Sequence, residues 1–285
     1  MKKIALITDS TASLSPAQIA RYGITTVPLA VIWGAETFED GVTISPAEFY
    51  VKLQGAKVMP STSQPSVGKF QQAFENLLAQ DCDILGVFIS SKLSGTLDSA
   101  TQARELLTSG KEKIHLFDSE TTTVAMNLQL MAVARAAEAG ASTAECLRVA
   151  EAARVQSGVY FVLDTLEFLH RGGRIGGAAR FLGTALNMKP ILRMHEGKIE
   201  AQERIRTKGK ALDRLIELVS EQVSGKSSIR LVAAHSNTEA EALAVLRRAS
   251  AQLSPVETFH ADLSPVIGTH TGPGTVALSY LYGLD

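Results

Sequence analysis

The sequence has no apolar run long enough to cross a bilayer, and its net charge is close to zero. No uninterrupted apolar stretch reaches the roughly 18 residues that a membrane-spanning helix needs. The apolar run near the start is cut by Asp9, too early for an export signal. With 28 basic and 29 acidic side chains, the charge balance gives no reason to expect nucleic acid. We therefore expect a cytoplasmic protein with no integral membrane segment and no nucleic-acid partner.

Cysteines and cofactor motifs are also scarce. Cys82 and Cys146 lie far apart without a partner pattern, which argues against a disulfide framework or a zinc site. No metal-ligand spacing such as H-E-x-x-H occurs, and no P-loop is present. The glycine-rich stretch 172–176 lacks the Rossmann spacing, and no nucleophile elbow surrounds Ser94. The sequence thus predicts no metal, no cofactor and no catalytic motif.

The chain instead shows short β-rich runs that alternate with helical patterns. Several runs are almost continuously apolar, as strands covered on both faces require. In the first half, strands are predicted at 4–8, 25–33, 84–90 and 114–118. Capping-box spacing at 45–48 and 142–145 predicts two helix starts. We expect an α/β fold whose N-terminal part is an open, mostly parallel sheet flanked by helices.

The pattern restarts after Gly158. A strand at 159–163 and a helical stretch through Arg180 precede a hairpin predicted from 190–194 and 198–204. Apolar residues from Leu212 to Val223 follow helical spacing, and strands at 229–234 and 256–260 flank another helix. We therefore expect two α/β domains, 1–158 and 159–285, with the ligand site between them. The boundary is soft by about ten residues, because boundaries are the weakest feature of sequence patterns.

Small polar residues gather where several predicted strands end. Thr8 and Asp9 end the first strand, a hydroxyl-rich stretch at 90–96 follows the third, and another lies at 61–66. In open α/β sheets, ligands bind outside the carboxyl ends of the strands. Ser, Thr and Asp are also good helix N-caps, so each of them alone fits a structural role equally well. Their accumulation at one edge favours a binding site.

The segment 268–274 reads Gly-Thr-His-Thr-Gly-Pro-Gly and runs into an apolar stretch from Thr275. We expect a helix to begin there, and the N–H groups at a helix start suit an anion. Glycines would let the backbone approach that anion closely. A plain strand-to-helix turn is the alternative. The other five histidines are most simply surface or packed residues.

Five segments occur in the order seen in the DegV family, and the match spans essentially the whole chain: 8–10, 62–66, 94–96, 171–175 and 268–274. The sequence therefore resembles that family, which includes the fatty-acid-binding subunits of bacterial fatty acid kinase. Residues 189–192, Lys-Pro-Ile-Leu, match as well. One departure is Leu97, where an aromatic residue often follows the Ser-Gly-Thr segment, and it bears on local packing.

The resemblance implies a two-domain protein that holds one long-chain fatty acid, such as palmitate or oleate, in an apolar tunnel. It places the carboxylate at Thr62 and Ser94, with His270 nearby. Supporting positions that it implies are Thr8, Asp9, Ser63, Gly95, Thr96, Arg174, Thr269 and Thr271. It further implies a non-enzymatic role in lipid transport or fatty acid metabolism, in which a separate ATP-dependent kinase subunit phosphorylates the bound acid.

Two other functions remain open at this point. An enzyme could act on a small phosphorylated or carboxylated metabolite at the same edge, and a Ser94–His270–Asp9 triad can be drawn on paper, although the sequence supplies no geometry for it. A DNA-binding regulator is the third reading, against which the near-neutral charge and the missing recognition motif argue.

Overall fold

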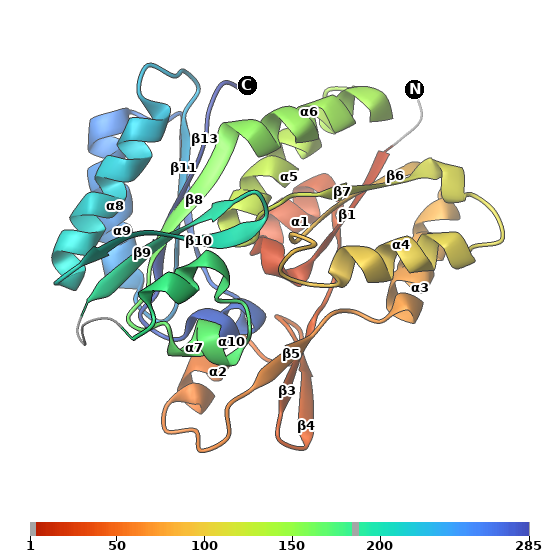
Figure 1. The fold of residues 1–285 in the computed structure, drawn as a ribbon. Helices are drawn as coiled ribbons and strands as arrows, with labels where there is room; N and C mark the ends of the chain where they lie inside the picture. The colour runs from red at the N-terminus through yellow and green to blue at the C-terminus, as the bar shows by residue number, and fades with distance from the viewer. Residues whose placement is uncertain (1–3, 184–187, 285) are drawn as a thin grey trace.

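A computed structural model describes residues 4–183 and 188–284, and within these ranges the strands form three sheets (Figure 1). The first sheet has the order β2 (Thr25–Val27), β1 (Ile4–Asp9), β6 (Asp83–Phe88) and β7 (Ile114–Asp118), all parallel. Helices cover both of its faces. The expected α/β fold with a parallel sheet flanked by helices is confirmed.

The side chains of β1 alternate between the two faces of this first sheet, and each face is covered by helices. Ala5 and Ile7 face the helices α3 (Val67–Leu78) and α4 (Thr96–Leu106), whereas Leu6 faces the core on the opposite side. On that opposite side lies α5 (Thr123–Glu138), twelve of whose residues are buried. This helix packs against β6 of the first sheet and against β8, β11 and β13 of the second sheet. It is therefore buried between the two sheets.

The second sheet is mixed and has six strands. Its order is β10 (Lys198–Ile205), β9 (Lys189–His195), β8 (Ser157–Val162), β13 (Val276–Leu281), β11 (Arg230–His235) and β12 (Glu257–Asp262). Among the strand pairs described in this sheet, β11 and β12 run parallel and the others antiparallel. The helices α8 (Lys208–Val223) and α9 (Glu239–Leu253) cover its outer face, while α5 and α6 (Thr143–Gln156) lie between the two sheets (Figure 1).

A small antiparallel sheet lies apart from the two large ones. It consists of β4 (Glu36–Glu39), β3 (Ala30–Trp33) and β5 (Ser61–Ser63), with α1 (Pro16–Tyr22) and α2 (Pro46–Leu53) in the same part of the chain. Late in the sequence, α10 (Pro265–Thr271) returns to pack on α2, β3 and β5 and on α7 (Glu167–Arg171) (Figure 1). The two halves of the chain are thus interleaved here, and the division at residue 158 stays a prediction.

Most of the expected elements are observed, including the β9–β10 hairpin and both helices with capping boxes. Three expectations were wrong. The run 25–33 splits at Pro28 into β2 and β3, which belong to different sheets; proline has no N–H for a ladder. The stretch through Arg180 contains only the short helix α7 and a 3₁₀ segment, Gly176–Phe181. The apolar stretch after Thr275 is the central strand β13, not a helix.

Within residues 4–183 and 188–284, no helix combines the length and the apolar character needed to span a membrane. Cys82 and Cys146 are both buried, and the Cys82 thiol donates a hydrogen bond to the Leu77 carbonyl.

Candidate functional site

A cavity lies where the end of the parallel sheet meets the inner face of the six-stranded sheet and α10. Its interior volume is about 180 Å³, within about 980 Å³ of empty space that includes its open mouth. The apolar lining comes from both halves of the chain: Leu29, Ile89, Leu93, Val159, Phe161, Leu169, Met194, Ile199, Leu263, Val266, Ile267 and Ala277. The polar lining is Thr62, Ser63, Gln64, Ser94, Thr122, Thr123, Arg174, His270, Thr271 and Thr275.

Two of the predicted residues meet directly at the polar side of this cavity. Thr62 is the central residue of β5, and His270 lies in the last turn of α10. The Thr62 hydroxyl and His270 Nε2 form a hydrogen bond of 2.8 Å. Burial, and secondarily the charge of Arg174, lower the pKa of His270 from 6.5 to about 4. The imidazole is therefore neutral at physiological pH and bears one donor and one acceptor.

Ser94 lies beside the start of α4, which has no side-chain cap. Its hydroxyl is 2.9 Å from the Thr96 hydroxyl, and Gly95 takes the N-cap position. Gly95 lies against the Gln64 side chain, since a Cβ on Gly95 would be 2.5 Å from Gln64 Oε1 and the Gln64 amide would have to move. Gln64 in turn donates from Nε2 to the Ser99 hydroxyl (3.1 Å). The segments 62–66 and 94–96 are thus packed together, next to a helix N-terminus suited to an anion.

Arg174, from the segment 171–175, lines the cavity and is exposed at the surface. Its Nε donates to the Leu93 carbonyl (3.2 Å) and its Nη1 to the Gly172 carbonyl (2.7 Å). Gly172 lies against the imidazole, since a Cβ there would be 2.1 Å from His270 Nδ1. That nitrogen is buried and has no partner among the described residues. The glycine is therefore required by close contact with His270.

The segment 268–274 differs from the expectation that it starts a helix. It ends α10 and turns into β13, so His270 is near a helix C-terminus, where the dipole disfavours an anion. The N-terminus of α10 is occupied by Asp40, which accepts a hydrogen bond from the Val266 N–H (3.1 Å). The glycines of this segment also lie against side chains rather than in the cavity.

Two of those glycines show the contacts clearly. A Cβ on Gly272, whose φ is +73°, would lie 2.3 Å from the Phe168 ring. On Gly274, with φ +78°, it would lie 1.8 Å from the Asp164 carboxylate. Both positions need glycine for the positive φ and for space.

Some supporting residues lie outside the cavity. Of the predicted set, Ser63, Arg174 and Thr271 line it, whereas Gly95, Thr96 and Thr269 do not. The Thr269 and Thr271 hydroxyls both donate to carbonyls one turn back within α10.

Thr8 and Asp9 are the clearest exceptions, because they serve the sheet. The Thr8 hydroxyl donates to the Val87 carbonyl (2.7 Å). Asp9 is fully buried and accepts from the N–H (2.9 Å) and hydroxyl (2.6 Å) of Thr11 and from the Ile89 N–H (2.8 Å); burial nevertheless raises its pKa to about 6. The partner of the His270 ring is Thr62, so the structure does not assemble a Ser94–His270–Asp9 triad.

Sequence reasoning missed Thr122 and Thr123, which line the cavity from the start of α5, as its N-cap and its first residue. Thr123 has φ +56°, uncommon for a β-branched residue, and the buried Thr122 hydroxyl has no partner among the described residues. The run of three threonines after the predicted strand at 114–118 was the signal that could have found them.

A family described as "Uncharacterised protein, DegV family" matches residues 3–283. The chain belongs to the DegV family. A DegV domain-containing protein of Halalkalibacterium halodurans is 35% identical over 281 residues, covering 98% of this chain and 99% of that relative.

Solved structures of DegV proteins share the fold. A DegV family protein from Thermus thermophilus, described by its fatty acid binding, has a TM-score of 0.93 and 34% identity over 99% of this chain and all of that one. DegV from Bacillus subtilis, described as a fatty acid binding protein, has a TM-score of 0.90 and 31% identity over 99% of this chain and all of that one. A DegV family protein from Ruminococcus gnavus, solved with vaccenic acid, has a TM-score of 0.85 and 26% identity over 97% and 99% of the two chains.

Proposed function

We propose that this DegV family protein binds one long-chain fatty acid, such as palmitate or oleate, in the cavity described above. The observation that carries the proposal is the composition of the cavity, in which a polar group with Thr62, His270 and Arg174 close together accompanies a mainly apolar lining. A fatty acid has the same division. Similar proteins from Thermus thermophilus and Bacillus subtilis are described as binding fatty acids.

The carboxylate would lie between Thr62, Ser94 and His270. An ionised group out of water needs several donors. If Nε2 of the neutral His270 ring carries the proton and donates it to Thr62, the Thr62 hydroxyl is free to donate its own proton to the carboxylate. Ser94 and the uncapped start of α4 would supply further donors. Arg174 would add positive charge.

The tail would supply most of the affinity. Burying about fourteen methylenes at ~0.8 kcal/mol each contributes on the order of 11 kcal/mol before binding costs are subtracted. The polar residues would then fix the orientation and select a free acid over an ester. In this view the protein is a carrier and not an enzyme, and it uses no cofactor.

A carrier in this orientation would present its cargo to a partner. Ser63, Gln64 and Arg174 are exposed, so the carboxyl end faces the surface. We extend the proposal to a separate ATP-dependent kinase that phosphorylates the bound acid within the cytoplasm, in the service of lipid transport or fatty acid metabolism.

Native mass spectrometry of the purified protein tests the binding. We expect a copurified long-chain acid, and stoichiometric uptake of palmitate or oleate after delipidation. Methyl palmitate is the matched control, because it keeps the tail and removes the charged headgroup. A protein that takes up neither acid, or that takes up the ester equally well, would contradict the proposal. Adding a fatty acid kinase and ATP then tests for acyl phosphate formation.

A further inference from the structure

A second pocket lies directly behind the acyl cavity. It has a volume of about 300 Å³, and its lining is mostly polar: Ser119, Glu120, Thr121, Gln129, Arg154, Ser157, Tyr160, Arg193, His195, Glu196, Gln222 and Tyr280 are among its residues. Two apolar residues, Val159 and Met194, line both this pocket and the acyl cavity. They therefore form the partition between an apolar and a polar compartment.

Strand register places this partition far from His270. Thr275 donates from its hydroxyl to the Thr271 and Gly272 carbonyls, which fixes it beside the end of α10. Thr275, Ala277 and Ser279 alternate onto the same face of the sheet, and Ser279 pairs with Val159 of β8. The four residue steps from Thr275 to Ser279 span roughly 14 Å at about 3.4 Å per residue. An acyl tail that starts at His270 and follows this face meets Val159.

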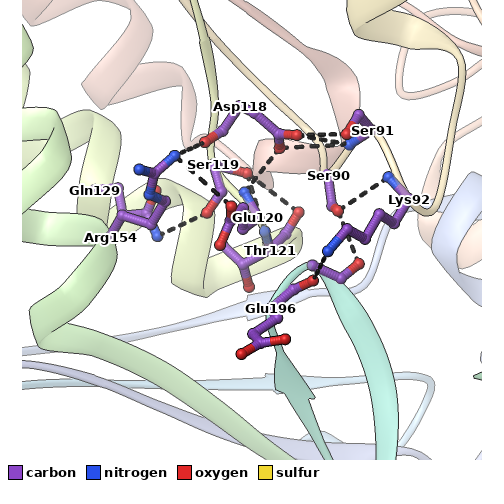
Figure 2. A network of polar contacts seen from close by, with 11 residues as sticks. Ser90, Ser91, Lys92, Asp118, Ser119, Glu120, Thr121, Gln129, Arg154 and Glu196 are labelled. Carbon is purple, nitrogen blue, oxygen red and sulfur yellow. Dashed lines mark hydrogen bonds and ion pairs between the residues drawn. The ribbon is translucent and has the colours of Figure 1, made fainter. Parts of the chain in front are cut away.

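The hairpin that carries Met194 leaves the sheet at this point. β9 pairs with β10 along its whole length but with β8 only from Ile191 to Arg193. Its tip is held by the loop after β6: Ser90 donates to the Gly197 carbonyl (2.7 Å), and Lys92 Nζ to the Glu196 carbonyl (2.7 Å) (Figure 2). Met194 is therefore the first residue of β9 beyond its pairing with β8, where the two strands part.

The polar pocket has groups left to bind. Gln129 is 1% exposed and donates to the Ser119 carbonyl and the Ser157 hydroxyl, but its Oε1 has no partner among the described residues. Arg193 forms no ion pair with any described residue. Gln129 and Arg154 lie with the 118–121 loop above the hairpin tip (Figure 2). A methyl-ended chain gains nothing from such surroundings, whereas a carboxylate-ended chain does.

We propose that Met194 and Val159 set the upper limit of acyl chain length, by separating the acyl cavity from the polar pocket at Arg193. This inference rests on the proposed function. A chain longer than the cavity must displace Met194 and place its methyl end among polar groups. Removing the Met194 side chain joins the compartments, and a long α,ω-dicarboxylic acid can then reach Arg193 with its second carboxylate.

The test is a set of affinities for myristate, palmitate, stearate, arachidate and octadecanedioic acid, measured with delipidated full-length protein. In Met194→Ala we expect the affinity for arachidate relative to palmitate to rise roughly tenfold, because about two further methylenes fill the space that the Met194 side chain leaves. The affinity for the diacid should also rise roughly tenfold, because its second carboxylate forms a charged hydrogen bond with Arg193. The double variant Met194→Ala/Arg193→Gln should lose this rise in diacid affinity but keep the rise in arachidate affinity.

Ile199→Ala is the matched control, since Ile199 pairs with Met194 in the hairpin but lines only the acyl cavity. It enlarges the cavity without opening the partition, so the diacid should gain nothing. Val159→Ala tests the same partition independently of the hairpin. If wild type binds fatty acids but both Met194→Ala and Val159→Ala keep its ranking of chain lengths, the inference is wrong. A wild type that binds no acid contradicts the proposed function instead.

Discussion

The Thr62 hydroxyl lies 2.8 Å from Nε2 of His270, although 208 residues separate the two in the chain. Thr62 is on the central position of a short strand, and His270 is at the end of a helix packed against that strand. This contact joins the small antiparallel sheet to the C-terminal part of the fold. It also fixes a neutral imidazole at the polar side of the cavity.

The protonation of His270 can be measured directly. Because burial lowers its pKa to about 4, its ring resonances should stay at their neutral positions from pH 8 to about pH 5 in the ligand-free protein. Bound palmitate should move the titration upward, since a carboxylate favours imidazolium. NMR titration of the ligand-free and the palmitate-bound protein checks both expectations, and the His270→Gln variant assigns the ring resonances. A ring that titrates near pH 6.5 would contradict the burial argument.

The same group affects stability with pH. The unfolded state takes up the proton near pH 6.5 and the folded state only near 4, so the stability contributed by neutral His270 is lost as pH falls through this window. The destabilisation caused by His270→Gln should therefore shrink between pH 7 and pH 4.5. Urea unfolding of both proteins across this range measures it, and a constant difference would argue against the shift.

Loss of either hydroxyl should weaken fatty-acid binding. Thr62→Ala and Ser94→Ala should each cost roughly 1.5–3 kcal/mol, the usual value for a hydrogen bond to a charged group, or about ten- to hundredfold in affinity. Thr62→Ser keeps the hydroxyl and is the control. A double-mutant cycle should show coupling if both residues hold one carboxylate. Wild-type affinity in both single variants would remove them from the carboxylate site.

Gly172→Ala should disturb the site without touching a ligand. The added methyl would lie 2.1 Å from His270 Nδ1, so the ring must shift, and such overpacking typically costs about 1–3 kcal/mol. We expect weaker fatty-acid binding and lower thermal stability. Gly68→Ala in α3, where nothing lies within 4 Å, is the matched control and should leave both nearly unchanged. Equal behaviour of the two variants would contradict the contact.

Asp40 should hold the start of α10. Its carboxylate accepts hydrogen bonds from the Val266 N–H and from the Ser10 hydroxyl (2.7 Å). In Asp40→Asn the amide NH₂ would replace one of these acceptor oxygens and would face a donor. We expect a loss of about 1–3 kcal/mol in unfolding free energy and faster hydrogen exchange at the amides of Gly268 in α10 and of Gly272 at its C-cap. Ser264→Ala removes the side-chain cap of the same helix and should act in the same direction. Unchanged exchange in both variants would mean that these caps do not support the helix.

Arg174 has two roles that can be separated. It bonds the backbone of Leu93 and Gly172 and is exposed at the surface. Arg174→Ala should lower fatty-acid affinity if its charge holds the carboxylate, and should lower only the rate of acyl phosphate formation if it docks the kinase. Calorimetry and a reconstituted kinase assay distinguish the two results.

The local patterns of this chain predicted much of the fold. Continuous apolar runs marked the buried strands β1, β6 and β7, and capping boxes marked the starts of α2 and α6. Such features depend on neighbours within a few residues, so they are readable in sequence. Pro28 was a local signal for the break between β2 and β3, but an apolar run does not say which sheet it joins or, as for β13, whether it is helical.

The sequence by itself determined the α/β class, the family and the motif residues, because these depend on residue type and order. Only the tertiary structure decided which motif residues meet. The Thr62 hydroxyl forms a hydrogen bond with His270, and Asp9 binds backbone at the end of the first sheet. The glycines of 268–274 lie against side chains, where a larger residue would not fit. The tertiary structure also placed Met194 and Val159 between two pockets. Contacts between segments so far apart depend on how sheets and helices pack, which no local pattern encodes.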